Sequence, residues 1–150
     1  MTATLPQQNL AAELKIGRVG QLVGKTPLYE ITGVFRKPGV RIFAKLEWQQ
    51  IGGSVKSRPA FNIIKNALRD GQLDLNDFRQ RHLLDATSGN TGIAYASICA
   101  ALGIPVTLCL PENASVERKR ILQSLGAHII YTSRLDGTDG AQLKAKELHR

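Results

Sequence analysis

The chain has 150 residues, of which 43% are hydrophobic, and its 20 basic and 12 acidic residues give it a net charge of +8 at pH 7. This length suits one domain with a single core. A basic chain is typical of nucleic-acid binding, but the basic residues are dispersed and only 5% of residues are aromatic, so this is the least favoured class. No long apolar run or leader pattern is present. We therefore expect a cytoplasmic protein that does not span a membrane.

The cysteines and histidines lack the spacing of a metal site. Cys99 and Cys109 both lie in apolar surroundings, and neither is spaced as a ligand partner of His82, His128 or His149. We predict no metal, no disulfide framework, and two reduced cysteines in the core.

The N-terminal part of the chain contains little recognisable chemistry. Residues 1–14 are polar with one short apolar stripe, which predicts a loosely attached extension or a single helical turn. Residues 17–31 contain Gly20, Gly24 and Pro27 as breakers and predict a turn that leads into a short strand. Residues 37–39 form a Lys-Pro-Gly turn, after which residues 42–47 predict another strand.

A lysine follows that strand within the sequence Gly-Gly-Ser-Val-Lys-Ser-Arg-Pro. We expect a helix after Lys56, with Ser57 as its N-cap and Pro59 in its first turn. The helix dipole, nearby backbone N–H groups and partial burial would disfavour the ammonium form of Lys56. A neutral amine is a nucleophile that forms Schiff bases with carbonyl compounds or pyridoxal phosphate. The alternative is a solvated surface lysine.

The second half of the chain alternates between apolar runs and helix-length segments. The apolar runs begin at Leu83, Val106 and Ile129, each 23 residues after the previous one. This spacing is typical of βαβ units, and continuous apolar runs are typical of parallel strands covered on both faces. With the strand near Ile42, they predict an α/β fold: an open, mainly parallel sheet in three layers with helices on both faces.

Glycines and capping residues predict where the helices end. The helix after Lys56 should end at Gly71, and the polar residues 72–81 should form a loop. A helix over 91–102 should be buried because it has almost no charged residue. Further helices are expected over 115–125 and from 140 onward, with Ser115 and Asp139 as caps.

The loop between the strand near Leu83 and the buried helix has the composition of an anion site. Residues 87–92 read Thr-Ser-Gly-Asn-Thr-Gly, in which two glycines permit a tight turn and the hydroxyl and amide groups supply donors. The helix N-terminus adds free N–H groups at the end of a strand where α/β sheets bind ligands. The loop lacks the lysine of a P-loop and the spacing of a dinucleotide fingerprint, so a carboxylate is favoured. The alternative is a capped turn without a ligand.

Four motifs together point to a known family. They are G-K-T-P-L at 24–28, G-G-S-V-K-x-R at 52–58, T-S-G-N-T-G at 87–92 and L-P-E-N-A-S-x-E-R at 110–118. Over residues 16–150 the chain resembles the cysteine synthase and cystathionine beta-synthase family of pyridoxal-phosphate enzymes, fold type II. The resemblance implies the N-terminal part of a fold like that of the tryptophan synthase beta subunit.

The resemblance also implies roles for individual residues. Lys56 would form the internal aldimine with pyridoxal 5'-phosphate and later shuttle protons, and Asn90 would contact the 3-hydroxyl of the cofactor. The substrate α-carboxylate would be bound by the remaining residues of the second motif, namely Thr87, Ser88, Gly89 and Thr91. This agrees with the anion site expected from the composition of that loop.

The chain departs from the family pattern in two respects. The family usually has N-P-G-G-S-V-K-D-R where residues 50–58 of this chain carry Gln50, Ile51 and Ser57 in place of asparagine, proline and aspartate. The family's phosphate loop, its substrate-contacting glutamine and the hydroxyl opposite the pyridine nitrogen are expected beyond residue 150. The chain therefore resembles an N-terminal half. Residues 1–41 would belong to the larger domain of the full-length family, and residues 42–150 would form the small domain that binds cofactor and substrate.

The implied activity is β-replacement by a cysteine synthase, in which O-acetylserine and sulfide give cysteine and acetate. The alternatives are cystathionine beta-synthase, another β-replacement enzyme acting on serine or phosphorylated serine, or a noncatalytic fragment or binding module. The implied partners are a small amino-acid substrate, a second copy in a homodimer and serine acetyltransferase. We expect the isolated 150-residue chain to be inactive by itself.

Overall fold

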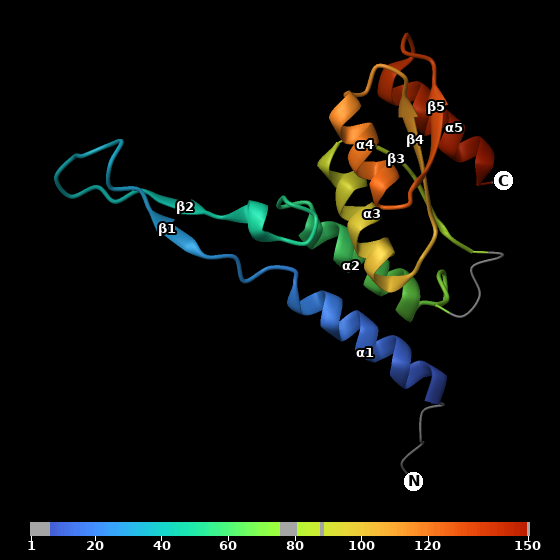
Figure 1. Cartoon of the computed structure of the whole chain (residues 1–150), viewed down its shortest axis with the longest axis horizontal. Coiled ribbons are helices and arrows are strands. Elements are labelled where there is room, and N and C mark those ends of the chain that lie inside the picture. The colour runs from blue at the N-terminus through green and yellow to red at the C-terminus, as the bar shows by residue number, and fades with distance from the viewer. Residues whose placement is uncertain (1–6, 76–80, 88, 150) are drawn as a thin grey trace.

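The computed structural model describes residues 7–75, 81–87 and 89–149. Figure 1 shows its elements in chain order, which are α1 (Gln7–Gln21), β1 (Leu28–Glu30), β2 (Phe43–Lys45), the 3-10 helix η1 (Glu47–Gln49), α2 (Ser57–Arg69), β3 (Leu83–Ala86), α3 (Asn90–Leu102), β4 (Val106–Pro111), α4 (Val116–Ser124), β5 (His128–Thr132) and α5 (Gly137–Leu148).

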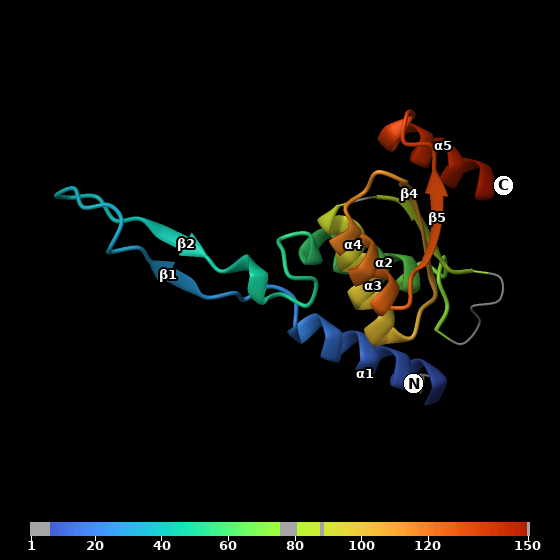
Figure 2. The same cartoon turned by 45° about the horizontal axis from the view of Figure 1, so that its top comes forward.

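The centre of the molecule is a parallel sheet in the order β3-β4-β5. Every residue of β4 is buried, as expected for a strand covered on both faces. Helices α3 and α4 lie on one face of this sheet and α5 lies on the other (Figures 1 and 2). The predicted α/β class with a parallel sheet between helical layers is confirmed, and the three strands form where the apolar runs predicted them.

Helix α3 is the buried helix that the sequence predicted. It packs against β4 on one side and against α1, α2 and α4 on others. Apart from Tyr95, its buried positions are small or aliphatic, and Ala94, Ala96 and Ile98 are completely buried. The helix ends at Gly103, whose φ of +77° is a left-handed conformation that glycine adopts without strain.

The strand near Ile42 does not belong to the parallel sheet, so that part of the fold prediction is wrong. It is β2, which pairs antiparallel with β1 and places Leu28 opposite Lys45. The turn between these strands contains a bridge from Lys37 to Val40, with Gly39 at a φ of +77°. Local turn chemistry therefore pairs β2 with its neighbour in sequence. The hairpin extends away from the rest of the molecule (Figures 1 and 2).

The hairpin is exposed, but α1 is well packed, so the loosely attached extension or single helical turn expected over residues 1–14 is wrong for the described residues 7–14. Large apolar side chains of the hairpin are exposed, with Leu28 at 62% and Val34 at 89%. By contrast, α1 is a full helix whose Val19 is buried in the core. Gly20 lies inside this helix, and a Cβ there would come within 2.9 Å of the Phe61 ring. Gly20 therefore allows close packing of α1 on α2 instead of breaking the chain.

The predicted caps and helix ends are partly correct. Ser115 caps α4 as expected, because its Oγ accepts a hydrogen bond of 3.3 Å from the Arg118 N–H. Asp139 was expected to cap the last helix, but it lies inside α5, whose N-cap position is Asp136. The loop expected over residues 72–81 lies partly outside the described residues.

Both cysteines are buried and free, as predicted. Burial raises the pKa of the Cys99 thiol to about 12, so this thiol stays protonated and unreactive at neutral pH. Within the described ranges, no helix has both the length and the apolar character needed to cross a bilayer.

Candidate active site

The two motifs of the sequence lie at the starts of two helices that pack against each other. Lys56 occupies the N-cap position of α2, and Gly89 occupies that of α3. Helices α2 and α3 are in contact. Because Thr87 follows the last residue of β3, the second motif lies at the carboxyl end of a parallel strand, which is where α/β sheets bind ligands.

The Lys56 loop, defined here as residues 50–56, packs tightly against α3. A Cβ on Gly52 would lie 2.8 Å from the Cα of Ala94 and 2.8 Å from the Oγ of Ser57, so only glycine fits there. The N–H of Gly52 donates to Ser57 Oγ at 3.0 Å, and the N–H of Gly53 donates to the Gln50 carbonyl at 2.8 Å. These contacts place the loop beside the first turns of α3.

Ser57 does not serve as the N-cap that the sequence predicted. The helix begins at Ser57 itself, whose side chain is completely buried and turns back to accept from Gly52. The physical reason is the tight Gly-Gly turn, which brings the buried N–H of Gly52 within reach of the Ser57 hydroxyl, and a buried N–H needs an acceptor. The residue that replaces the family's aspartate therefore closes the Lys56 loop.

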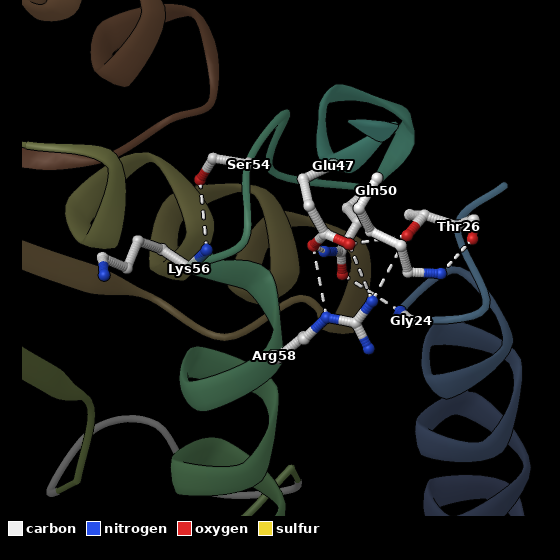
Figure 3. A network of polar contacts seen from close by, with 8 residues as sticks. Gly24, Thr26, Glu47, Gln50, Ser54, Lys56 and Arg58 are labelled. Atoms are coloured by element: carbon white, nitrogen blue, oxygen red, sulfur yellow. Dashed lines mark hydrogen bonds and ion pairs between the residues drawn. The ribbon is translucent and has the colours of Figure 1, made fainter. Parts of the chain in front are cut away.

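Lys56 presents its amine to the outside of the loop. The residue is exposed, so the partial burial considered from the sequence is wrong. Its backbone N–H donates to Ser54 Oγ at 3.2 Å. Figure 3 shows its side chain extending away from the polar network on the other side of the loop. The amine is thus accessible to a carbonyl compound.

Thr87 contacts two glycines of the second motif. The Gly89 N–H donates to Thr87 Oγ1 at 3.4 Å. A Cβ on Gly92 would lie 2.9 Å from Thr87 Cγ2, so Gly92 lets the start of α3 pack directly on Thr87. Asn90 is exposed, whereas Thr87, Gly89 and Thr91 are partly buried. Ser88 lies outside the described residues.

The start of α3 is suited to an anion. Its N-cap is a glycine, which has no side chain to satisfy the first N–H groups of the helix. These groups and the helix dipole favour a negative charge. The Lys56 loop packs on Ala94, in the second turn of α3, through Gly52. The two motifs are thus carried by elements that are in direct contact.

A polar network that the sequence reasoning missed lies on the side of the Lys56 loop opposite the Lys56 side chain (Figure 3). Its centre is the carboxylate of Glu47, which accepts from Arg58 Nη2 at 2.9 Å and Nε at 3.2 Å and from Thr26 Oγ1 at 2.6 Å. The Arg58 hydrogen bonds, followed by that of Thr26, lower the pKa of Glu47 to about 2. Gln50 also donates to Glu47, and its Oε1 accepts from the Gly24 N–H at 3.0 Å.

A separate cavity of about 520 Å³ lies at the amino end of the sheet. Its lining includes His82, His128 and His149 together with Arg81. Across the described ranges, no group of three or more histidine, cysteine, aspartate or glutamate side chains is arranged to hold a metal ion. The cavity lies at the opposite end of the strands from Thr87 and is not part of the site.

Comparison with known proteins identifies the class. Residues 19–150 match the family described as pyridoxal-phosphate dependent enzyme. The chain therefore belongs to the pyridoxal-phosphate-dependent enzymes, which confirms the resemblance seen in its motifs and the cofactor class. Its structural neighbours share the fold: a cysteine synthase from Entamoeba histolytica superposes with a TM-score of 0.78 at 32% identity, covering 99% of this chain and 41% of the other.

Particular relatives refine this assignment. A cysteine synthase from Aquifex aeolicus is 46% identical over 131 residues, covering 85% of this chain and 39% of the relative. An O-acetylserine dependent cystathionine beta-synthase from Bacillus subtilis is 38% identical over 130 residues, covering 87% of this chain and 41% of the relative. The chain thus spans about two fifths of the length of the curated relatives that it matches.

Proposed function

We propose that the chain provides the lysine and the carboxylate-binding loop of a β-replacement enzyme that makes cysteine and acetate from O-acetylserine and sulfide. The observation that carries this proposal is the position of the Lys56 loop against α3, whose N-terminus begins the second motif. An exposed amine beside a helix start that favours anions fits the carbonyl of the cofactor and the α-carboxylate of an amino acid.

Each residue of the site has a defined task in this proposal. Lys56 holds the cofactor through Nζ and afterwards moves the proton of the substrate α-carbon. Asn90, which is exposed at the start of α3, orients the ring through its 3-hydroxyl. The substrate carboxylate is bound by Thr87, Ser88, Gly89 and Thr91. When bound, pyridoxal phosphate withdraws electrons from the substrate α-carbon, which makes that carbon acidic.

The hairpin supports a domain boundary that differs from the one expected from the sequence. The sequence predicted a boundary between residues 41 and 42, which falls between the paired strands β1 and β2. Because backbone hydrogen bonds hold the two strands together, we propose that the whole hairpin joins the larger domain and that the small domain starts at Glu47. Exposed Leu28, Tyr29 and Val34 on the hairpin are consistent with a surface that another part of the protein covers.

A second candidate is O-acetylserine-dependent cystathionine synthesis. The relative from Bacillus subtilis has this activity in its name and is similar over most of the chain. The two activities share O-acetylserine as the amino-acid donor and differ in the nucleophile, so the same Lys56 and carboxylate loop serve both. A homodimer, an association with serine acetyltransferase and a cytoplasmic location complete the proposal. A noncatalytic binding module remains the contrasting hypothesis.

The test of this function is selective reaction of Lys56 with the cofactor. The purified chain is mixed with pyridoxal phosphate, reduced with borohydride and mapped by mass spectrometry. We expect Lys56 to be labelled in preference to the other lysines and a visible absorbance band to appear before reduction. Lys56→Ala should remove both signals, with Lys65→Ala as a control on the same helix. Equal labelling of all lysines would contradict the proposal.

A further inference from the structure

The ends of the Lys56 loop are held by one carboxylate. At the beginning of the loop, Gln50 donates to Glu47 Oε2. Two residues beyond its end, Arg58 donates to both oxygens of Glu47, at 2.9 and 3.2 Å. The Glu47 side chain is only 21% exposed, and Gln50 is 5% exposed. Glu47 therefore fixes the distance between the two points from which the loop extends.

The same carboxylate connects the loop to the base of the hairpin. Thr26, just before β1, is buried and donates to Glu47 at 2.6 Å while accepting from Arg58 at 3.3 Å. Lys45, at the end of β2, donates to the Thr26 carbonyl. The N–H of Gly24 is held by Gln50 at 3.0 Å. Contacts to Glu47 thus join three segments: the one before β1, the one after β2, and the start of α2.

We propose that Glu47 is a positioning residue for Lys56, and that Gln50, which replaces the family's asparagine, extends its action to the start of the loop. Glu47 does not touch the amine, since the Lys56 side chain extends away from the network (Figure 3). It acts through Arg58 and Gln50, which set the path of the Gly52–Gly53 turn and hence the place where Nζ meets its carbonyl partner. The proposal rests on the function assigned above to Lys56.

The hairpin supplies a matched control for this role. Within the hairpin, Glu30 and Arg41 form another bidentate ion pair, with distances of 2.8 and 2.9 Å. This pair is more exposed, at 36% for Glu30 and 68% for Arg41, and Arg41 also lies over the ring of Phe43 in the hairpin. Glu30→Gln and Glu47→Gln therefore remove the same charge and the same kind of pair, but only Glu47→Gln releases the loop.

The experiment compares wild type, Glu47→Gln, Glu47→Asp and Glu30→Gln. The first readout is the fraction of borohydride-trapped pyridoxal phosphate found on Lys56 relative to the other lysines. We expect Glu47→Gln to lower this fraction about threefold or more. The reason is that misplacing a reacting group by about 1 Å can lower the reaction rate by on the order of a hundredfold. Glu47→Asp, which keeps the charge, should restore part of the loss, and Glu30→Gln should have no effect.

The second readout is hydrogen exchange of the Gly52 and Gly53 amides, which needs no cofactor. Glu47→Gln should speed their exchange by about tenfold, whereas exchange in β4 should be unchanged. Circular dichroism verifies the fold. If Glu47→Gln does not fold, Gln50→Ala is used in its place. Gln50→Ala leaves the Glu47–Arg58 pair intact and releases only the start of the loop.

The outcomes separate this proposal from the assigned function. Selective Lys56 labelling in wild type that is equal in Glu47→Gln would overturn the positioning role and leave the function intact. Absence of selective labelling in wild type would contradict the function, and the exchange rates would then decide the positioning role alone. An equal response to Glu30→Gln and Glu47→Gln would show that the Glu47–Arg58 pair only supports the hairpin. That result would also overturn the proposal.

Discussion

Gly52 and Ala94 approach so closely that a Cβ on the glycine would lie 2.8 Å from the alanine Cα. This contact presses the Lys56 loop against the helix that begins the second motif. It explains why the first residue of the Gly-Gly pair is a glycine: there is no room for a Cβ. The neighbouring Cα belongs to the backbone of a buried helix, which cannot shift without disturbing the core.

Gly52→Ala should therefore both destabilise the protein and displace the loop. We expect a loss of about 1 to 3 kcal/mol, the usual cost of overpacking a tight interior. Urea unfolding measures the loss, and Gly33→Ala is the matched control, because a Cβ on Gly33 meets nothing within 4 Å. Equal stability of the Gly52 variant and wild type would contradict the close packing.

Ser57→Ala tests the hydrogen bond that closes the loop. The substitution leaves the Gly52 N–H without its acceptor at a completely buried position. Leaving such a group unsatisfied costs about 1 to 3 kcal/mol. Ser124→Ala removes an exposed side-chain bond to the Ile121 carbonyl and should change stability by less than about 0.5 kcal/mol. A loss no larger for Ser57→Ala than for Ser124→Ala would exclude the closing role.

The acid stability of the protein should depend on Glu47. Its hydrogen bonds from Arg58 and Thr26 lower its pKa in the folded state from 4.5 to about 2. A carboxyl with a depressed folded pKa stabilises the protein above its unfolded pKa, and this contribution disappears as the pH falls from about 4.5 through about 2. The stability difference between wild type and Glu47→Gln should be constant above pH 5 and shrink below it. Denaturant titrations at several pH values measure it, and a difference that does not change with pH would refute the assignment.

The sequence predicted the elements whose signals are local. The apolar runs placed β3, β4 and β5, and Gly103 placed the end of α3, because these features depend on short-range patterns. It failed for strand pairing, which the pattern of a single segment does not determine. The pattern of residues 42–47 indicates a strand but not its neighbour, so β2 was assigned to the wrong sheet.

The site also combines residues that have a local sequence signal with contacts that have none. The motifs singled out Lys56 and the loop after β3 by composition. The Glu47 network could not be found in this way, because Thr26 and Arg58 lie 21 and 11 residues from Glu47 and only the fold brings them together. The one sequence signal for this network is the pair of opposite charges, Glu47 and Arg58, on either side of the glycine turn. Such pairs are common on solvated surfaces, so the signal is weak.

The polypeptide of residues 1–150 should not form cysteine at a useful rate by itself. The chain spans about two fifths of its curated relatives. In the proposed site, Lys56 and Asn90 hold the cofactor, and we expect these two contacts alone to orient its ring poorly. Reaction requires the ring to be oriented, and a misplacement of about 1 Å costs on the order of a hundredfold. The assay is cysteine formation from O-acetylserine and sulfide, with and without the remaining C-terminal part of the Aquifex aeolicus relative added in trans. Turnover should appear only with that part present and should be absent when the chain carries Lys56→Ala. Rapid turnover by residues 1–150 alone would show that one covalent attachment and the carboxylate loop suffice to orient the ring.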